Sequence, residues 1–162
     1  MAREEGVAVA SRRFKKTSLM NTPVRLAMKK LILHTDGGAR GNPGPAGIGA
    51  ALTTPEGDVV AEVSRYIGET TNNQAEYRAL IAGLEKAKEV HADSLTCYLD
   101  SELIVKQLQG DYKIKNADLK PLVEIVRHLA HQFKEITFTH VPRERNKHAD
   151  SLVNRAIDAA GR

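Results

Sequence analysis

Short runs of apolar and β-branched residues alternate with longer segments of helical periodicity from residue 31 onward. Five runs predict strands: Leu31–Thr35, Ile48–Thr53, Val59–Tyr66, Leu95–Leu99 and Ile136–Val141. Four segments predict helices: Ala75–Val90, Ser101–Gln109, Asn116–Phe133 and Asn146–Ala160. The order β-β-β-α-β-α-α-β-α predicts an α/β fold, with a mixed five-stranded sheet flanked by helices on its faces.

Turn and capping residues divide these elements. The Gly- and Pro-rich stretch Gly37–Gly47 predicts a tight loop after the first strand, and Pro55–Asp58 predicts a hairpin turn. Thr70–Asn73 supplies N-cap chemistry for the first long helix. Because Pro121 lies inside the segment Asn116–Phe133, the helix there has an alternative start at Leu119–Lys120, with the proline in its first turn.

Composition indicates one ordinary globular domain. The chain has 162 residues, of which 41% are hydrophobic and 27% charged. Its single cysteine, Cys97, excludes a disulfide framework and fits a reducing compartment, so we expect a cytoplasmic protein. Since no apolar run approaches the roughly 18 residues that span a bilayer, we expect no membrane association.

Positive charge is concentrated at the start of the chain. Residues 1–30 hold eight basic and two acidic side chains, whereas the remaining residues hold 16 basic and 18 acidic ones. We therefore expect residues 1–29 to form a disordered basic arm and residues 30–162 to form the folded domain. The arm is either a tether for a polyanion or an over-long start, because Met28 directly precedes the first strand.

Four acidic residues stand where surface carboxylates are not expected. Asp36 and Asp100 each follow a predicted strand, and Glu76 lies on the apolar face of the first long helix. Asp150 flanks the apolar stripe of the last helix. Taken singly, the strand-end residues could be turn or cap residues, and the helical ones could belong to buried ion pairs or N-caps.

Taken together, these four positions favour one acidic cluster. At about 4 Å and an effective dielectric near 20, each like-charge pair costs roughly 4 kcal/mol, so a fully ionised cluster needs cations. Carboxylate and water oxygens suit Mg²⁺ or Mn²⁺. Two such ions about 4 Å apart can clamp the attacking and leaving oxygens of a phosphodiester.

Four segments of the chain resemble the signature motifs of type 1 ribonuclease H. They are Asp-Gly-Gly-Ala-Arg-Gly-Asn-Pro-Gly-Pro-Ala-Gly from Asp36, Thr-Thr-Asn-Asn-Gln-Ala-Glu ending at Glu76, Tyr-Leu-Asp-Ser around Asp100, and Asn-Lys-His-Ala-Asp ending at Asp150. The resemblance implies that these four acids are catalytic and bind two Mg²⁺ or Mn²⁺ ions. It implies endonucleolytic cleavage of the RNA strand of RNA/DNA hybrids, leaving 5′-phosphate and 3′-hydroxyl ends. We expect a monomer, with double-stranded RNA as a further candidate substrate.

The same resemblance implies a set of substrate contacts. The backbone of Gly38 and Ala39, together with Asn42 and Asn73, would read the minor groove, where the 2′-hydroxyl distinguishes RNA from DNA. Thr71 and Asn42 would lie at a phosphate of the DNA strand.

Three departures from the family pattern are visible. The stretch Gln109–Asn116 is too short to hold the basic protrusion of the best-known bacterial members. Glu102 stands where the family has a substrate-contacting glutamine, and a carboxylate there would repel phosphate. In place of the family's loop histidine the chain offers Arg143 or His140, and we favour Arg143 as the catalytic residue because it begins the loop before Asp150.

Two other functions are compatible with such a fold. A non-catalytic hybrid-binding module is disfavoured, because clustered acids would repel a polyanion without serving binding. A related 3′-exonuclease is disfavoured by the Gly-Asn-Pro-Gly loop and the Thr-Asn-Asn segment.

Overall fold

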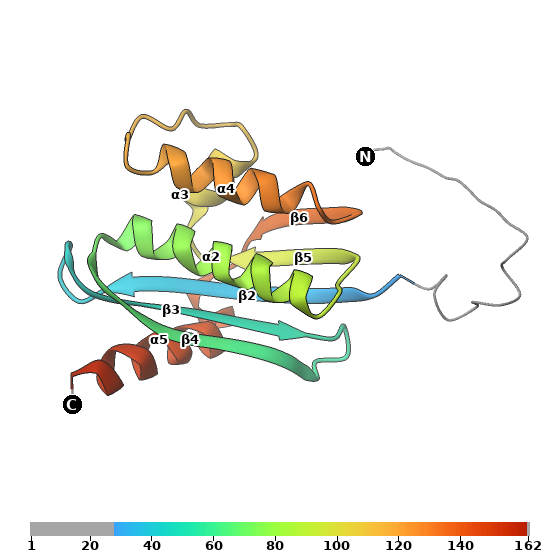
Figure 1. Cartoon of the computed structure of the whole chain (residues 1–162), viewed down its shortest axis with the longest axis horizontal. Coiled ribbons are helices and arrows are strands. Elements are labelled where there is room, and N and C mark those ends of the chain that lie inside the picture. Colours follow the sequence, from blue (N-terminus) through green and yellow to red (C-terminus); the bar gives the residue numbers. More distant parts are fainter. Residues whose placement is uncertain (1–27, 162) are drawn as a thin grey trace, which may run out of the picture.

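A computed structural model describes residues 28–161 and contains a mixed five-stranded sheet (Figure 1). Its strands are β2 (Lys30–Ala39), β3 (Gly44–Thr53), β4 (Val59–Thr70), β5 (Ser94–Leu99) and β6 (Glu135–His140). They lie in the order β4-β3-β2-β5-β6. The β4–β3 and β3–β2 pairs are antiparallel, whereas β2–β5 and β5–β6 are parallel. The predicted fold class and element order are confirmed.

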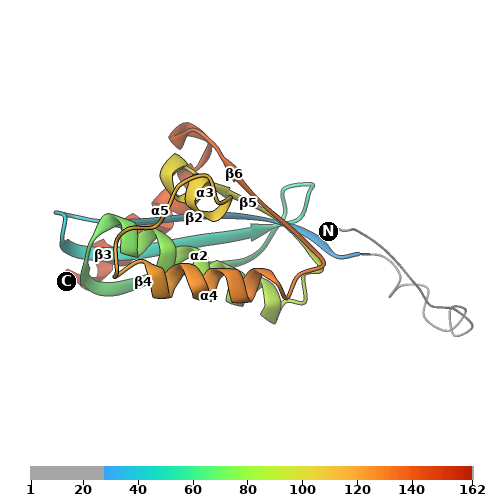
Figure 2. The same cartoon turned by 90° about the horizontal axis from the view of Figure 1, so that it is seen from above.

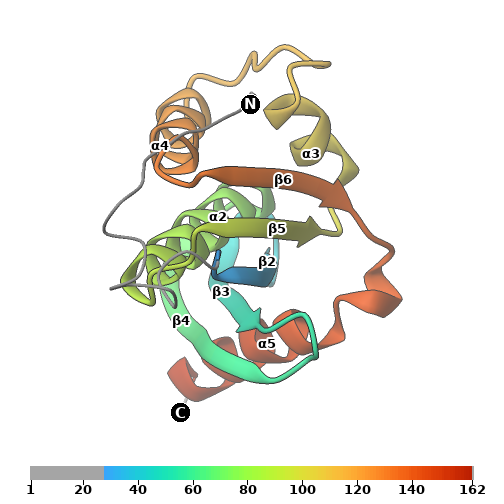
Figure 3. The same cartoon turned by 90° about the vertical axis from the view of Figure 1, so that its right-hand side faces the viewer.

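Helices cover both faces of this sheet. They are α2 (Asn72–Glu89), α3 (Glu102–Leu108), α4 (Lys120–Ala130) and α5 (Lys147–Ala160), and a short 3-10 helix, η3 (Arg143–Arg145), precedes α5. Helices α2 and α4 lie side by side on one face (Figure 2). Helix α5 packs on the opposite face, against β3 and β4 (Figure 3). Helix η3 was not predicted from the sequence.

The main core lies between the sheet and α2. Leu33 of β2 is fully buried, as are Leu80 and Leu84 of α2. A Cβ on Gly83 would lie 2.9 Å from a methyl carbon of Leu33, so the glycine lets the helix sit close to the sheet. This packing confirms that the helix face carrying Glu76 points toward the sheet.

The glycine-rich loop is shorter than predicted. Strand β2 continues to Ala39 and β3 begins at Gly44, so the prediction of a loop over Gly37–Gly47 is wrong and only residues 40–43 form the turn. Gly38 pairs with Gly47 within the antiparallel ladder. A Cβ on Gly47 would lie 3.0 Å from the Val153 carbonyl oxygen of α5, whereas a Cβ on Gly38 would meet no atom closer than 3.9 Å.

Capping residues lie at the helix starts as predicted, although α2 begins at Asn72 and not at the predicted Ala75. The Thr71 hydroxyl accepts a hydrogen bond from the Gln74 amide (3.2 Å), and the Ser101 hydroxyl accepts one from the Ile104 amide (3.3 Å). Helix α4 begins at Lys120, so the alternative start is correct and the start at Asn116 is wrong. A proline cannot donate an amide hydrogen bond, and its place in the first turn avoids that loss.

The described chain joins the sheet at its first residues. The Lys29 amide donates to Asp93 Oδ2 (2.8 Å), and the Lys29 carbonyl accepts from the Asp93 and Ser94 amides (2.9 and 3.1 Å). The rest of the expected arm, residues 1–27, lies outside the described residues. Within residues 28–161, no helix combines the length and apolar character needed to cross a membrane.

Candidate active site

The register of two parallel strands brings the first two acids together. Thr35 of β2 pairs with Leu99 of β5, so the next residues, Asp36 and Asp100, lie beside each other at one end of the sheet. The amide of Asn146 stabilises this junction, because its Nδ2 donates to the Thr35 carbonyl (2.8 Å) and to Asp100 Oδ2 (2.9 Å). Asn146 is only 1% exposed, so these bonds are shielded from water.

Gly37 allows the third acid to reach this junction. A Cβ at position 37 would lie 2.2 Å from the Ala75 carbonyl oxygen and 2.6 Å from the Glu76 amide nitrogen. Only glycine therefore permits the first turn of α2 to approach β2 so closely. As a result, one carboxylate oxygen from each of Asp36, Glu76 and Asp100 lies within 4.8 Å of the others.

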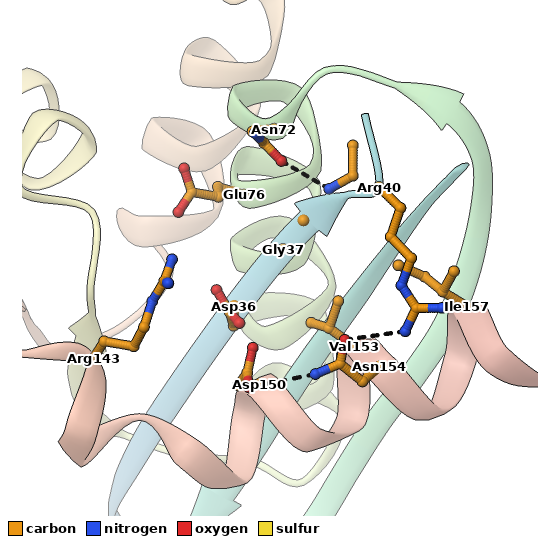
Figure 4. A pocket seen from close by; sticks show the side chains of 12 residues that line it. Asp36, Gly37, Arg40, Asn72, Glu76, Arg143, Asp150, Val153, Asn154 and Ile157 are labelled. Carbon is orange, nitrogen blue, oxygen red and sulfur yellow. Dashed lines mark hydrogen bonds between the residues drawn. The ribbon is translucent and has the colours of Figure 1, made fainter. Parts of the chain in front are cut away.

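The fourth acid comes from the opposite face of the sheet. A Cβ on Gly49 would lie 2.4 Å from the Ala149 carbonyl oxygen, so this glycine lets α5 lie directly on β3. Asp150, in the first turn of α5, lines the same pocket as Asp36 and Glu76 (Figure 4). It is exposed and is not part of the three-oxygen group.

Burial and the neighbouring carboxylates raise the pKa values of two acids of this cluster, Asp36 and Glu76. Burial, followed by the charges of Asp100, Asp150 and Glu76 and a hydrogen bond with Asp150, raises the pKa of Asp36 to about 8. Burial and the charge of Asp100 raise the pKa of Glu76 to about 7, although the Arg143 guanidinium opposes that shift. Partly buried carboxylates with raised pKa values are typical of functional sites.

The donor set fits a hard divalent cation. All the converging groups are carboxylate oxygens, which Mg²⁺ and Mn²⁺ prefer as ligands. The three grouped side chains remain partly exposed, so water could supply the remaining ligands of an ion there. An ion there would offset the repulsion that raises the pKa values of Asp36 and Glu76.

The predicted substrate residues lie beside the cluster in one hydrogen-bonded turn. Asn72 Oδ1 accepts from the Ala39 amide (2.8 Å), and Asn42 Oδ1 accepts from the Asn72 amide (3.1 Å). Gly38 and Ala39 line the pocket. Thr71 and Asn73 flank Asn72 at the start of α2, where Thr71 is the N-cap. The structure therefore joins the two motifs that contain these five residues.

The structure separates the two candidates for the family's histidine position. Arg143, at the start of η3, lines the pocket with Glu76 and Asp150. His140 ends β6 and is not among the pocket-lining residues of the described chain. Glu102 is exposed in the first turn of α3, where an acidic side chain complements the helix dipole.

Four residues around the pocket were not predicted from the sequence to have a role in the site. Asn72 and Asn146 lie in the quoted motifs, so their motif membership was an available signal. Arg40 and Asn154 line the pocket and hydrogen-bond to each other (3.2 Å) across 114 residues of sequence. No local pattern indicates that pairing, since it depends on how α5 crosses the sheet.

This chain resembles known proteins over most of its length. The family model described as Reverse transcriptase-like matches residues 34–156. The bifunctional protein Rv2228c of Mycobacterium tuberculosis is 48% identical over 81% of this chain, and the chain spans only 36% of that relative. Ribonuclease HI of Halobacterium salinarum is 46% identical over 78% of this chain and 64% of its own length.

A solved structure extends the likeness to three dimensions. LC11-RNase H1, determined in complex with an RNA/DNA hybrid, is 48% identical and has a TM-score of 0.78. The match covers 82% of this chain and 99% of that one. The family-model match over residues 34–156 contains all four motifs. The chain therefore belongs to the type 1 ribonuclease H family, in its short form.

Proposed function

We propose that this protein is an endonuclease that hydrolyses the RNA strand of RNA/DNA hybrids with two Mg²⁺ or Mn²⁺ ions. The products would carry 5′-phosphate and 3′-hydroxyl ends. The observation that carries the proposal is the meeting of carboxylate oxygens from Asp36, Glu76 and Asp100 within 4.8 Å, at one end of the sheet. The LC11 enzyme in complex with a hybrid supports the choice of substrate.

The four acids would hold the ions. Asp36, Asp100 and Glu76 supply the clustered oxygens, and Asp150 lies across the same pocket. When bound, the ions would supply a water of lowered pKa and stabilise the charge of the departing 3′-oxygen. Asn146 fixes the orientation of Asp100 through its 2.9 Å hydrogen bond, so that this carboxylate need not reorganise when the ions bind.

Arg143 would neutralise substrate charge instead of transferring protons. Its guanidinium lies close enough to Glu76 to favour the ionised carboxylate, and it lines the pocket. Arginine is not a base near neutral pH, but its five donors suit a phosphate. We therefore assign the proton-transfer steps to water and not to this side chain.

The turn beside α2 would read the RNA strand. Asn72 binds the Ala39 amide and is itself held by Asn42, so the backbone at Gly38 and Ala39 is fixed before substrate arrives. Such a fixed set of polar groups in a minor groove can select for the 2′-hydroxyl. Thr71 and Asn73, which flank Asn72, complete the proposed contact surface.

A labelled hybrid tests this proposal. The full chain is incubated with Mg²⁺ or Mn²⁺ and a hybrid whose RNA strand is labelled, beside matched duplex DNA, duplex RNA and single-stranded RNA. We expect internal cuts with 5′-phosphate ends on the hybrid, and their loss in Asp100→Asn. The matched control Asp111→Asn removes an exposed carboxylate in the segment after α3 and should cleave like wild type. Shortening from the ends, or binding without cleavage, would contradict the proposal.

A further inference from the structure

Asp150 differs from the other three acids in how it is held. It is exposed, and it projects from α5 outside the three-oxygen group. One turn further along α5, the Asn154 amide Nδ2 donates to Asp150 Oδ2 at 3.4 Å. Arg40 Nη2 in turn donates to Asn154 Oδ1 at 3.2 Å (Figure 4). These contacts form a chain of hydrogen bonds that ends on the fourth carboxylate.

The chemistry of arginine fixes the direction of this chain. A guanidinium carries only donors, so Asn154 must present its carbonyl oxygen to Arg40. The amide NH₂ of Asn154 is then left to face Asp150. A donor at that point restricts the rotation of the carboxylate. Without Arg40, the amide could turn its oxygen toward Asp150 and repel it.

Arg40 is itself anchored on two sides. Its Nη1 forms a salt bridge with Asp158 Oδ1 at 2.6 Å, one further turn along α5. Its amide donates to the Pro45 carbonyl at 2.8 Å, across the β2–β3 turn. The residue before it, Ala39, is bonded to Asn72. The guanidinium therefore connects the substrate-reading turn to the helix that carries Asp150.

We propose that Arg40 and Asn154 are positioning residues for Asp150. Arg40 orients the Asn154 amide, and the amide holds Asp150 toward the divalent ions. The proposal rests on the proposed function only for the role of Asp150 as a metal ligand. It adds a physical link between the glycine-rich turn and the fourth carboxylate.

Metal binding provides the direct test. Calorimetric titration of the full chain with Mn²⁺, in the presence of a hybrid with a non-cleavable RNA strand, gives the ion affinity without turnover. Residues that orient metal ligands typically change affinity about 10-fold or more when removed, so we expect a loss of that order in Asn154→Ala. Arg40→Gln should lower the Mn²⁺ affinity several-fold. Arg40→Lys should lower it less, because lysine keeps a donor for Asn154. The matched control is Arg155→Gln, an exposed arginine on the same helix beside Ser64 and Tyr66, and it should bind as wild type does.

The double variant separates a chain of contacts from two independent effects. If Arg40 acts through Asn154, adding Arg40→Gln to Asn154→Ala should not reduce the Mn²⁺ affinity further. Both side chains are exposed, so the variants should fold, which melting curves check. At saturating metal, the KM for the hybrid should stay near the wild-type value while the metal concentration for half-maximal cleavage rises.

Three results would overturn the proposal. They are additive losses of Mn²⁺ affinity in the double variant, an unchanged Mn²⁺ affinity in Asn154→Ala, and a rise in KM for Arg40→Gln without any change in Mn²⁺ affinity. The last result would make Arg40 a direct substrate contact. Failure of the proposed function is distinguishable, because the wild-type chain would then leave the hybrid uncut whatever the variants do to Mn²⁺ binding.

Discussion

Replacing Asp100 with asparagine should inactivate the protein and yet make its metal-free form more stable. Asp100 lies within 4.8 Å of carboxylate oxygens of both Asp36 and Glu76. At that distance and an effective dielectric of about 20, each ionised pair costs roughly 3 kcal/mol. Because the three side chains are partly exposed, we expect a net gain of about 1–3 kcal/mol. The substitution keeps an oxygen that can accept from Asn146 Nδ2, so that hydrogen bond is preserved.

The gain should depend on pH in a defined direction. The pKa values of Asp36 and Glu76 are raised to about 8 and about 7, so both acids are protonated near pH 5 and ionised near pH 9. Repulsion by Asp100 is therefore largest at the higher pH. We expect the melting temperature of Asp100→Asn in EDTA to exceed that of wild type by about 4–12 °C near pH 9, and by little near pH 5. An equal or lower melting temperature near pH 9 would refute the clustering of charge.

Three further predictions test the fold and its electrostatics. The free energy of unfolding of the metal-free wild type should fall as the pH rises from about 4 to about 8, because folded Asp36 keeps a proton in this range that the unfolded chain has released. Denaturant titration at several pH values checks this. Gly37→Ala should cost about 3 kcal/mol, since its Cβ would lie 2.2 Å from a backbone oxygen, whereas Gly38→Ala, with 3.9 Å of clearance, should change stability by about 0.5 kcal/mol or less in the same titration. Tyr77→Phe should cost about 1–3 kcal/mol on urea unfolding, because it leaves buried Gln107 Oε1 without its 2.6 Å partner; a neutral result would contradict that estimate.

The sequence predicted the elements well where local chemistry decides them. Thr71 and Ser101 cap their helices, and Pro121 lies in a first turn, because each depends on neighbouring backbone groups alone. The structural roles of the strand glycines were predicted less well. Gly37 and Gly49 are glycines because a helix lies against each strand, and that contact forms only in the folded chain.

The same contrast holds for the site residues, some of which local sequence identifies while others depend on contacts in the folded chain. Glu76 was identified because a carboxylate on an apolar helix face is costly without compensation, a signal that the sequence carries. From the sequence, Asn146 was interpreted only as the start of a helix, because its hydrogen bond to Asp100 joins residues 46 positions apart. The pairing of Arg40 with Asn154 spans an even longer separation, so neither periodicity nor spacing predicts it.

We propose above all that the four acids hold divalent ions at one end of the sheet. Anomalous diffraction from crystals of the full chain soaked in Mn²⁺ with a non-cleavable hybrid tests it most directly. We expect Mn²⁺ peaks between Asp36, Glu76 and Asp100, one of them shared with Asp150, and their loss in Asp100→Asn. Strong Mn²⁺ peaks elsewhere, with this pocket empty, would contradict it.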